Sequence, residues 1–255
     1  MFNIENFDIK LETENLGRNF IYTEEISSTN SYLMKSNDEF LHGTTILSEF
    51  QNQGKGRINR PWFSEKGQNL TFSVLLKNDL EKYNPNHISL AASLAVSNSI
   101  ENLFQLKTEL KWPNDVLVNS KKVSGILLES TSMGSSLEKI IIGFGVNVNQ
   151  TKFIGEFKIR PTSIKFELRK EVTRERLLSE ILNTFEEILN EMSKGSKKLL
   201  DDWREKCRMI GEHIMINVGD EKKSGIFYDI DANGLMILKV GEDFEKIKNG
   251  DVLVR

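Results

Sequence analysis

The distribution of short apolar segments changes at about His213, and this change limits the folds that the chain can adopt. From there to the C-terminal end, strand-like pieces alternate with turn signals such as Gly219-Asp220 and Asn233-Gly234. Several short strands at close spacing are typical of a small all-β barrel. The five pieces are residues 214–218, 225–229, 235–238, 244–247 and 251–254. We therefore expect two domains, one over residues 1–209 and a small β domain over residues 210–255.

Strands and helices are mixed before this boundary. The clearest helix pattern covers residues 87–104, where small apolar side chains recur every three or four positions. Two more helices are predicted over residues 173–192 and 197–207, whereas residues 1–18 are weakly patterned and polar. Strands are predicted at residues 20–26, 44–48, 70–76, 109–112, 116–119, 123–128 and 140–148. This order of elements predicts an α+β domain with a mixed sheet.

Charge and cysteine content exclude several classes of protein. The 255 residues carry 34 Lys and Arg against 37 Asp and Glu, and the formal net charge of −3 is not that of a basic nucleic-acid coat. The single cysteine, Cys207, excludes an internal disulfide framework and a cysteine-based zinc site, and it fits a reducing compartment. The three histidines have no ligand-like spacing, so no metal site is predicted from a protein motif. No segment resembles a signal peptide or a membrane span, and we expect a cytoplasmic protein that does not bind membranes.

A polar loop at residues 51–60 places Lys55, Arg57 and Arg60 among glycines. Glycines let backbone N–H groups approach an anion, and guanidinium forks suit phosphate or carboxylate. The only large apolar residue of the loop is Ile58, whose burial would give about 1.5–3 kcal/mol. Ordering each residue costs about 1–2 kcal/mol. The loop therefore needs a bound anion to become ordered, unless it is an ordinary solvated turn.

Three more segments combine polar groups with breaks in predicted strands. In Lys111-Trp112-Pro113-Asn114-Asp115 the proline ends or bulges a strand, so a cation, an amide and a carboxylate meet at a break in the sheet. A hairpin turn is predicted at residues 119–121, and of the lysines at 121 and 122 only one can reach a given site, because successive strand residues face opposite ways. Gly125 lies within that strand and suggests close approach of another group. A capped strand end and solvated hairpin lysines are the alternatives for these segments.

The segment Gly143 to Asn149 places two glycines beside two asparagines on a predicted strand. It lacks the third glycine and the following helix of a dinucleotide-binding fingerprint, and a glycine-kinked core strand is the alternative. No GxSxG elbow exists, and neither Cys207 nor a histidine stands near the polar segments. This absence of a protein nucleophile favours transfer chemistry that depends on positioning and charge stabilisation.

Taken together and in this order, the segments resemble those of the biotin protein ligase family. Residues 111–115 are identical to its K-W-P-N-D motif. The other matches are Ser28-Thr29-Asn30 with its S-T-N signature, residues 54–62 with G-R-G-R-x-(G/N)-R-x-W, residues 122–127 with K-(L/V)-(A/S)-G-I-L, and residues 143–149 with G-x-G-x-N-x-N. Lys55 stands where the family often has arginine, which keeps the charge but loses the fork. The resemblance covers about residue 17 to the C-terminus.

The resemblance implies a mixed-sheet catalytic domain followed by an SH3-like β-barrel. It also implies a two-step ATP-dependent reaction: biotin is activated as biotinyl-5′-AMP with release of pyrophosphate, and is then transferred to a lysine of a biotin carboxyl carrier protein, an acetyl-CoA carboxylase subunit or related carboxylase. Mg²⁺ would accompany ATP. About twenty residues precede the resembling core, too few for the DNA-binding domain of some members, so the expectation is a monomeric or homodimeric ligase without nucleic-acid binding.

The resemblance also implies roles for single residues. Catalysis would involve Arg57, Lys111 and Lys122, with Asp115 orienting Lys111 or the incoming amine. The residues expected to bind biotin are Ser28, Thr29, Asn30, Gln51, Gly54, Lys55, Gly56, Arg57, Lys122 and Gly125. The residues expected to bind ATP are Arg57, Arg60, Trp62, Asn114, Asp115 and Asn147. Residues near 54–60 should be mobile without ligand and become ordered when biotin or the adenylate binds.

Three other functions compete with this expectation. A lipoate or octanoate ligase would share the adenylation chemistry, but its R-R-x-S-G-G-G-type motif is absent. A nucleic-acid binder would need a basic C-terminal domain, and the acids of residues 211–255 outnumber its cations. A noncatalytic biotin-binding module would not need Lys111, Lys122 and the cationic loop together.

Overall fold

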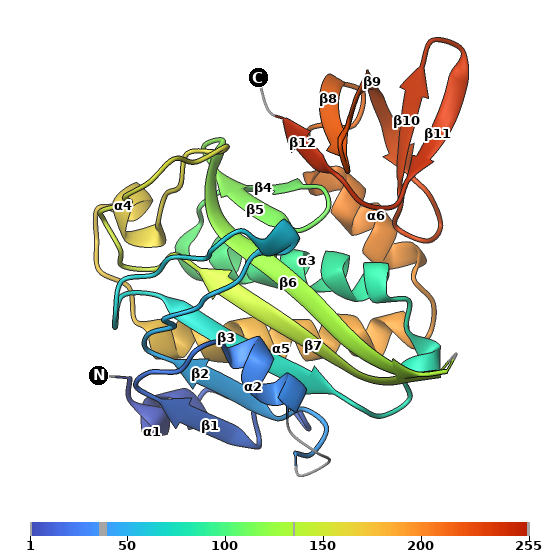
Figure 1. The fold of residues 1–255 in the computed structure, drawn as a ribbon. Coiled ribbons are helices and arrows are strands. Elements are labelled where there is room, and N and C mark those ends of the chain that lie inside the picture. The colour runs from blue at the N-terminus through green and yellow to red at the C-terminus, as the bar shows by residue number, and fades with distance from the viewer. Residues whose placement is uncertain (1, 36–39, 135, 254–255) are drawn as a thin grey trace.

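A seven-stranded mixed sheet forms the centre of the molecule in the computed structural model, which describes residues 2–35, 40–134 and 136–253 (Figure 1). The strand order is β1-β2-β3-β7-β6-β5-β4, and only β1 and β2 run parallel to each other. Their bounds are β1 Phe20–Thr23, β2 Thr45–Ser48, β3 Leu70–Leu76, β4 Thr108–Lys111, β5 Asp115–Val118, β6 Lys121–Met133 and β7 Ser136–Val146. The predicted α+β class with a mixed sheet is confirmed.

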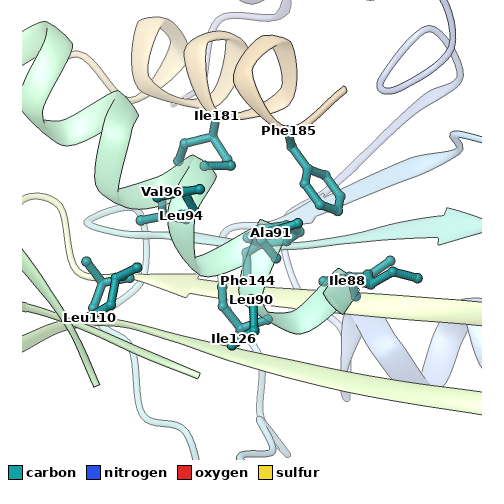
Figure 2. Packing of buried hydrophobic residues seen from close by; sticks show 14 of the residues in the cluster. Ile88, Leu90, Ala91, Leu94, Val96, Leu110, Ile126, Phe144, Ile181 and Phe185 are labelled. Atoms are coloured by element: carbon teal, nitrogen blue, oxygen red, sulfur yellow. The ribbon is translucent and has the colours of Figure 1, made fainter. Parts of the chain in front are cut away.

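One face of the sheet carries the main hydrophobic core. The long helices α3 (Pro85–Phe104) and α5 (Arg174–Met192) pack together and cover this face, and α6 (Lys197–Lys206) contacts both of them. Figure 2 shows α3 side chains between Ile181 and Phe185 of α5 and Phe144 of the sheet. Asn84 caps α3 through the N–H of Asn86, which explains why the helix begins two residues before the predicted start.

The opposite face of the sheet carries α2 (Thr29–Lys35) over a much smaller cluster. All seven residues of β3 are buried, because its side chains alternate between two covered faces. Phe72, Val74 and Leu76 belong to the main core, whereas Leu75 packs under α2. The polar residues Thr71 and Ser73 share the α2 face with Leu75, and this face holds the site described below.

The first residues of the chain are ordered, contrary to the weak pattern of residues 1–18. The structure has a short helix α1 (Ile4–Asp8) there, and the backbone is held by carboxylates of other elements. Glu186 of α5 accepts hydrogen bonds from the N–H groups of Glu14, Asn15 and Leu16. The apolar residues Phe2, Phe7, Leu11 and Leu16 are buried. Their spacing fits neither helix nor strand, so tertiary contacts rather than local periodicity order this segment.

A five-stranded antiparallel sheet of order β11-β10-β9-β8-β12 follows α6. Its strands are β8 His213–Val218, β9 Glu221–Ile230, β10 Met236–Val240, β11 Asp243–Ile247 and β12 Asp251–Leu253. It is joined to the first part by Trp112, whose indole N–H donates to the Gly234 carbonyl at 3.1 Å, and by Arg204, which donates to Asp229 at 2.8 Å. The predicted small β structure after the mixed-sheet part is confirmed, and the division into domains at residues 209 and 210 stays a prediction.

Three short elements complete the fold. They are the 3₁₀ turns η1 (Arg57–Asn59) and η2 (Leu80–Lys82) and the helix α4 (Ile164–Leu168), and each is too short to leave a periodic pattern in the sequence. Within the part of the chain that the structure describes, no helix is long and apolar enough to cross a membrane.

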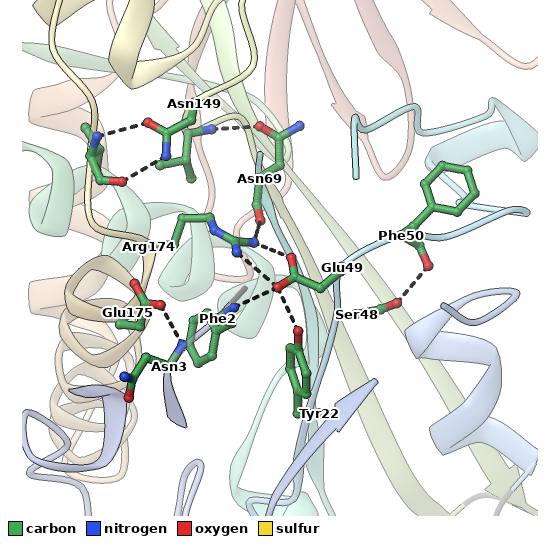
Figure 3. Close-up of polar contacts among 12 residues, drawn as sticks. Phe2, Asn3, Tyr22, Ser48, Glu49, Phe50, Asn69, Asn149, Arg174 and Glu175 are labelled. Carbon is green, nitrogen blue, oxygen red and sulfur yellow. Dashed lines mark hydrogen bonds and ion pairs between the residues drawn. The ribbon is translucent and has the colours of Figure 1, made fainter. Parts of the chain in front are cut away.

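A buried ion pair joins the N-terminal segment to the sheet and to α5 (Figure 3). Both guanidinium NH groups of Arg174 donate to the Glu49 carboxylate, at 2.5 and 3.0 Å, and both side chains are almost fully buried. Glu49 also accepts from the Tyr22 hydroxyl and the Phe2 N–H. Burial would raise the pKa of Glu49, but these hydrogen bonds and the Arg174 charge hold it below its usual value.

Replacing Arg174 by Met should destabilise the fold strongly, because Glu49 then keeps a buried charge without its cation. We expect the free energy of unfolding in urea to fall by about 3–5 kcal/mol, and the Glu49→Leu/Arg174→Met double variant to recover part of this loss. Lys82→Met breaks the exposed pair of Lys82 with Asp79 and should cause no measurable change. Equal effects of Arg174→Met and Lys82→Met would contradict this assignment.

The Glu49–Arg174 pair should also affect how the free energy of unfolding changes with pH. The lowered pKa of Glu49 stabilises the folded state above the unfolded pKa of about 4.3, and this contribution is lost as the pH falls through the folded value. The wild-type protein should therefore lose stability more steeply below about pH 4.3 than Arg174→Met does. Parallel curves for the two proteins would contradict the role of the pair.

Candidate active site

A cavity of about 600 Å³ opens on the α2 side of the central sheet. Its floor is the face of β6 and β7 that is turned away from α3 and α5. Its walls are the start of α2, the loop before Phe63, residues 153–161 and the start of β12. It is therefore bounded by both sheets of the protein. Among the residues predicted from sequence, those that line it are Ser28, Thr29, Asn30, Gln51, Lys55, Gly56, Arg57, Arg60, Trp62, Asn114, Asp115, Lys122, Gly125 and Asn147.

Two predicted residues lie outside the cavity lining. Gly54 accepts a hydrogen bond from the Trp62 N–H at 2.9 Å, and a Cβ atom on Gly54 would lie 2.4 Å from the Trp62 carbonyl oxygen. Lys111 is 3% exposed and pairs with Asp115 across the β4–β5 hairpin. Gly54 therefore closes the loop and Lys111 lies opposite Asp115 on the neighbouring strand, and neither belongs to the cavity lining.

Glycines on the floor make room for the side chains that cover it. The Trp62 ring lies on Gly145, where a Cβ atom would come within 2.4 Å of it, and on Gly125, where the distance would be 3.2 Å. Asn30 lies on Gly143, with its amide oxygen 2.4 Å from the position of a Cβ atom. The glycines of the G-x-G segment thus serve close side-chain approach. The buried indole N–H of Trp62 has no hydrogen-bond partner among the described residues, which leaves a donor available beside the cavity.

A β-bulge selects the lysine that enters the cavity. Between β5 and β6 the register shifts, so that Val116 pairs with Ser124 but Leu117 pairs with Lys122. Val123 is the extra residue, and it brings Lys122 to the same face as Gly125, three positions later. Lys121 instead donates to Glu167 at 2.9 Å outside this cavity. The strand alternation predicted that one lysine would reach the site, and the bulge determines which one.

Carboxylates neutralise the cations of the cavity. The Lys122 ammonium lies 2.7 Å from Asp115 and 5.6 Å from the centroid of the Trp62 ring. Burial lowers the pKa of Lys111, and the nearby charges of Asp115 and Asp251 oppose this shift. Burial also lowers the pKa of Arg57, again against two carboxylates. Cations held this way are partly dehydrated and available to an incoming anion.

The cationic loop is tied to the C-terminal sheet. Arg57 donates to Asn114 and to the Gly250 carbonyl, both at 3.2 Å. Asp251 accepts from Arg60 at 2.7 Å and from Lys158 at 2.6 Å. Burial would raise the pKa of Asp251, but these two hydrogen bonds and the cationic charges lower it to about 2. The Asp251 carboxylate of β12 therefore joins the segments that carry Arg60 and Lys158. The mobility of residues 54–60 without ligand stays a prediction.

Sequence reasoning missed several residues around the cavity. Lys158 and Asp251 lie in segments without a recognisable motif, and only the folded chain brings them to Arg60. Ser73 and Glu129 lie behind Asn30 and hold it by hydrogen bonds. A signal existed for Ser73, because it is a polar residue inside the apolar run of the strand at residues 70–76. Among the described residues, no group of three or more histidines, cysteines and acids could hold a metal ion.

Comparison with known proteins identifies relatives of both parts of the chain. The model of the biotin/lipoate A/B protein ligase family matches residues 22–147, and that of the biotin protein ligase C terminal domain matches residues 209–255. The bifunctional ligase/repressor BirA of Bacillus subtilis is 31% identical over 246 residues, which are 95% of this chain and 76% of that protein. The biotin–acetyl-CoA-carboxylase ligase of Mycobacterium tuberculosis is 29% identical over 90% of this chain and 86% of its own length.

A solved structure has the same architecture. The biotin protein ligase from Aquifex aeolicus in complex with biotin and ATP is 30% identical and superposes with a TM-score of 0.81, covering 92% of this chain and 97% of that one. The similarity thus extends over both sheets and the cavity between them.

Removing the shared carboxylate should loosen the loop above the cavity. In Asp251→Asn, Arg60 and Lys158 lose their common counterion, and we expect trypsin to cleave the native protein within residues 57–60 or after Lys158 about fivefold faster. Mass spectrometry of timed digests would locate the cuts. Asp243→Asn, which changes an exposed carboxylate on β11, is the control and should leave the rate unchanged. Identical digestion of the two variants would contradict the proposed tie.

Proposed function

The chain belongs to the biotin protein ligase family, and from this we propose that it is an ATP-dependent ligase that attaches biotin to a carrier protein. The single observation that supports this most strongly is the shared cavity of Lys122, Arg57 and the Ser28–Asn30 segment. It offers polar groups for a small acid at one end and cations for phosphates at the other. The A. aeolicus structure holds biotin and ATP in the corresponding fold.

In the first proposed step, an oxygen of the biotin carboxylate attacks the α-phosphorus of ATP. An acyl–phosphate bond forms, the bond to the β-phosphate oxygen breaks, and pyrophosphate leaves. Negative charge grows on the phosphate oxygens, and Lys122 would contact both the carboxylate and the phosphate, while Arg57 and Arg60 would hold the phosphates. Lys122 would then leave Asp115 and pair with the phosphate, on which the negative charge is growing.

The nucleoside would lie against the tryptophan and the strand amides. Trp62, Asn114, Asp115 and Asn147 line the cavity, and the free indole N–H of Trp62 is a donor in need of an acceptor. Mg²⁺ would enter with ATP as counterion of its phosphates, and Asp115, a buried carboxylate of the lining, fits the one or two protein oxygens that such an ion takes.

In the second proposed step, a lysine amine of a biotin carboxyl carrier protein attacks the acyl carbon of biotinyl-5′-AMP. The amide bond forms, the bond to the phosphate oxygen breaks, AMP leaves, and the amine nitrogen releases one proton to the solvent. The buried Lys111, which is the cross-strand neighbour of Asp115, would stabilise the growing charge, and Asp115 would orient the incoming amine. Residues 1–209 would thus carry the chemistry, and residues 210–255 would contact ATP or the carrier. We place the reaction in the cytoplasm, without nucleic acid, in a monomer or homodimer.

A lipoate or octanoate ligase is the alternative that a specific observation keeps open, since the family model of residues 22–147 includes those enzymes. Exchange of labelled pyrophosphate into ATP, with biotin, lipoate or octanoate as the only acid supplied, separates the two functions. We expect exchange with biotin alone. Exchange with lipoate or octanoate but not with biotin would overturn the proposed substrate, and no exchange with any acid would favour a noncatalytic binding module.

The adjacent lysines provide a matched test of the catalytic assignment. Lys122→Ala should lower biotin-dependent exchange by about 10²–10³-fold, the usual loss when one charge-stabilising donor is removed. Lys121→Ala removes the same side chain one residue earlier. It breaks the pair with Glu167 and the contact with the Phe166 ring, both outside the cavity, and should keep exchange within about threefold of wild type. Wild-type exchange by Lys122→Ala would contradict the role given to Lys122.

A further inference from the structure

A chain of polar side chains runs behind the biotin-binding end of the cavity. Asn30 Nδ2 donates to Glu129 at 2.7 Å, and Asn30 Oδ1 accepts from the Ser73 hydroxyl at 2.6 Å. The Ser73 hydroxyl lies 2.7 Å from Thr29 Oγ1, which in turn lies 3.0 Å from Gln51 Oε1. Thr29 and Gln51 line the cavity, whereas Ser73 and Glu129 stand outside its described lining.

The Asn30 amide has one favourable orientation. Its Nδ2 group faces two oxygens, those of the Glu129 carboxylate and, at 3.3 Å, the Leu127 carbonyl. Rotating the amide by half a turn would place Oδ1 against both acceptors. Gly143 provides the space for this packing, since a Cβ atom there would meet Asn30 Oδ1 at 2.4 Å. The oxygen of Asn30 therefore faces Ser73 and accepts the Ser73 proton.

The Ser73–Thr29 and Thr29–Gln51 contacts then have only one hydroxyl proton between them. Because the Ser73 proton is used on Asn30, the Ser73 and Thr29 oxygens can bond only through the Thr29 proton. Gln51 Oε1 also faces Thr29, because it accepts the Thr29 backbone N–H at 2.7 Å, and it competes for that same proton. Three oxygen–oxygen contacts thus share two hydroxyl protons. The Thr29–Gln51 end of the cavity is left with unused acceptor capacity.

We propose that Ser73 and Glu129 are positioning residues that make the Thr29–Gln51 end of the cavity an acceptor for ring N–H groups. This rests on the proposed function, and it names the chemical feature by which the site selects biotin. The ring of biotin carries two N–H donors, whereas lipoate and octanoate carry none. An N–H donor restores the missing proton, and an acid without one leaves buried oxygens facing each other, which is costly.

Two substitutions remove the proton deficit in different ways. In Ser73→Ala the Thr29 hydroxyl faces only Gln51, so one proton serves one contact. In Glu129→Leu only the Leu127 carbonyl, at 3.3 Å, still holds the Asn30 amide, so the amide can turn its NH₂ group toward Ser73, which supplies the third proton. Glu129→Gln retains an oxygen acceptor for Asn30 and should behave like wild type.

Calorimetric titration without ATP tests the proposal with two ligands: biotin, and an analogue whose two ring N–H groups are replaced by oxygen. We expect Ser73→Ala and Glu129→Leu to weaken biotin binding about five- to tenfold, as for one lost hydrogen bond, and to leave the affinity for the analogue unchanged. Glu129→Gln should restore biotin affinity. A structural defect would weaken both ligands alike, and that result, or unchanged biotin affinity in both variants, would overturn the proposal.

Ser99→Ala is the matched control, since Ser99 is also fully buried but its hydroxyl donates to Ala95 within α3. It should leave both affinities unchanged. Should Glu129→Leu fail to fold, Ser73→Ala alone decides, because it only shortens a small side chain. Failure of wild-type protein to bind biotin would refute the proposed function itself, whereas wild-type binding with equal losses for both ligands would refute only the roles of Ser73 and Glu129.

Discussion

The pairing of buried or half-buried cations with protein carboxylates is the interaction on which the site depends. Asp115 neutralises Lys122, and Asp251 neutralises Arg60 and Lys158. The need for a partner is greatest for Lys122, the least exposed of these three cations, because a charge removed from water must be compensated. The carboxylates hold these cations close to the cavity, so that binding of an anionic ligand requires exchange of one anion for another.

The fold supplies this arrangement through strands that are covered on both faces. One face of β3 and β7 presents large apolar residues such as Phe72 and Phe144 to α3 and α5. The other face presents small or polar residues, among them Thr71 and Gly145, to the cavity. Alternate residues of the same strands thus serve stability and chemistry. A substitution affects the core or the cavity according to which face of the strand its residue occupies.

Local patterns in the sequence predicted most of the fold and most of the polar residues that line the cavity. The helix at residues 87–104 and the strand at 70–76 have strong periodicity, and the polar segments around Arg57, Trp62 and Lys122 were recognisable. What could not be predicted depends on contacts between distant segments. Backbone groups between residues 3 and 16 are held by carboxylates of α5, and Asp251 meets Arg60 across 191 residues. Such contacts leave no spacing in the sequence, because only the folded backbone creates them.

The extra residue at Val123 has a consequence for how this sequence can vary. If Val123 joined the regular ladder opposite Leu117, simple alternation would return to β6 and every residue on its turn side would face the opposite way. Lys121 would then point to the floor and Lys122 away from it, although both amino acids and the turn at Asn119-Ser120 would be unchanged. Deletion of Val123 itself would leave Lys122 two positions before Gly125 and therefore still on the floor. Variants between residues 116 and 125 are therefore to be compared by whether they keep the bulge as well as by their composition.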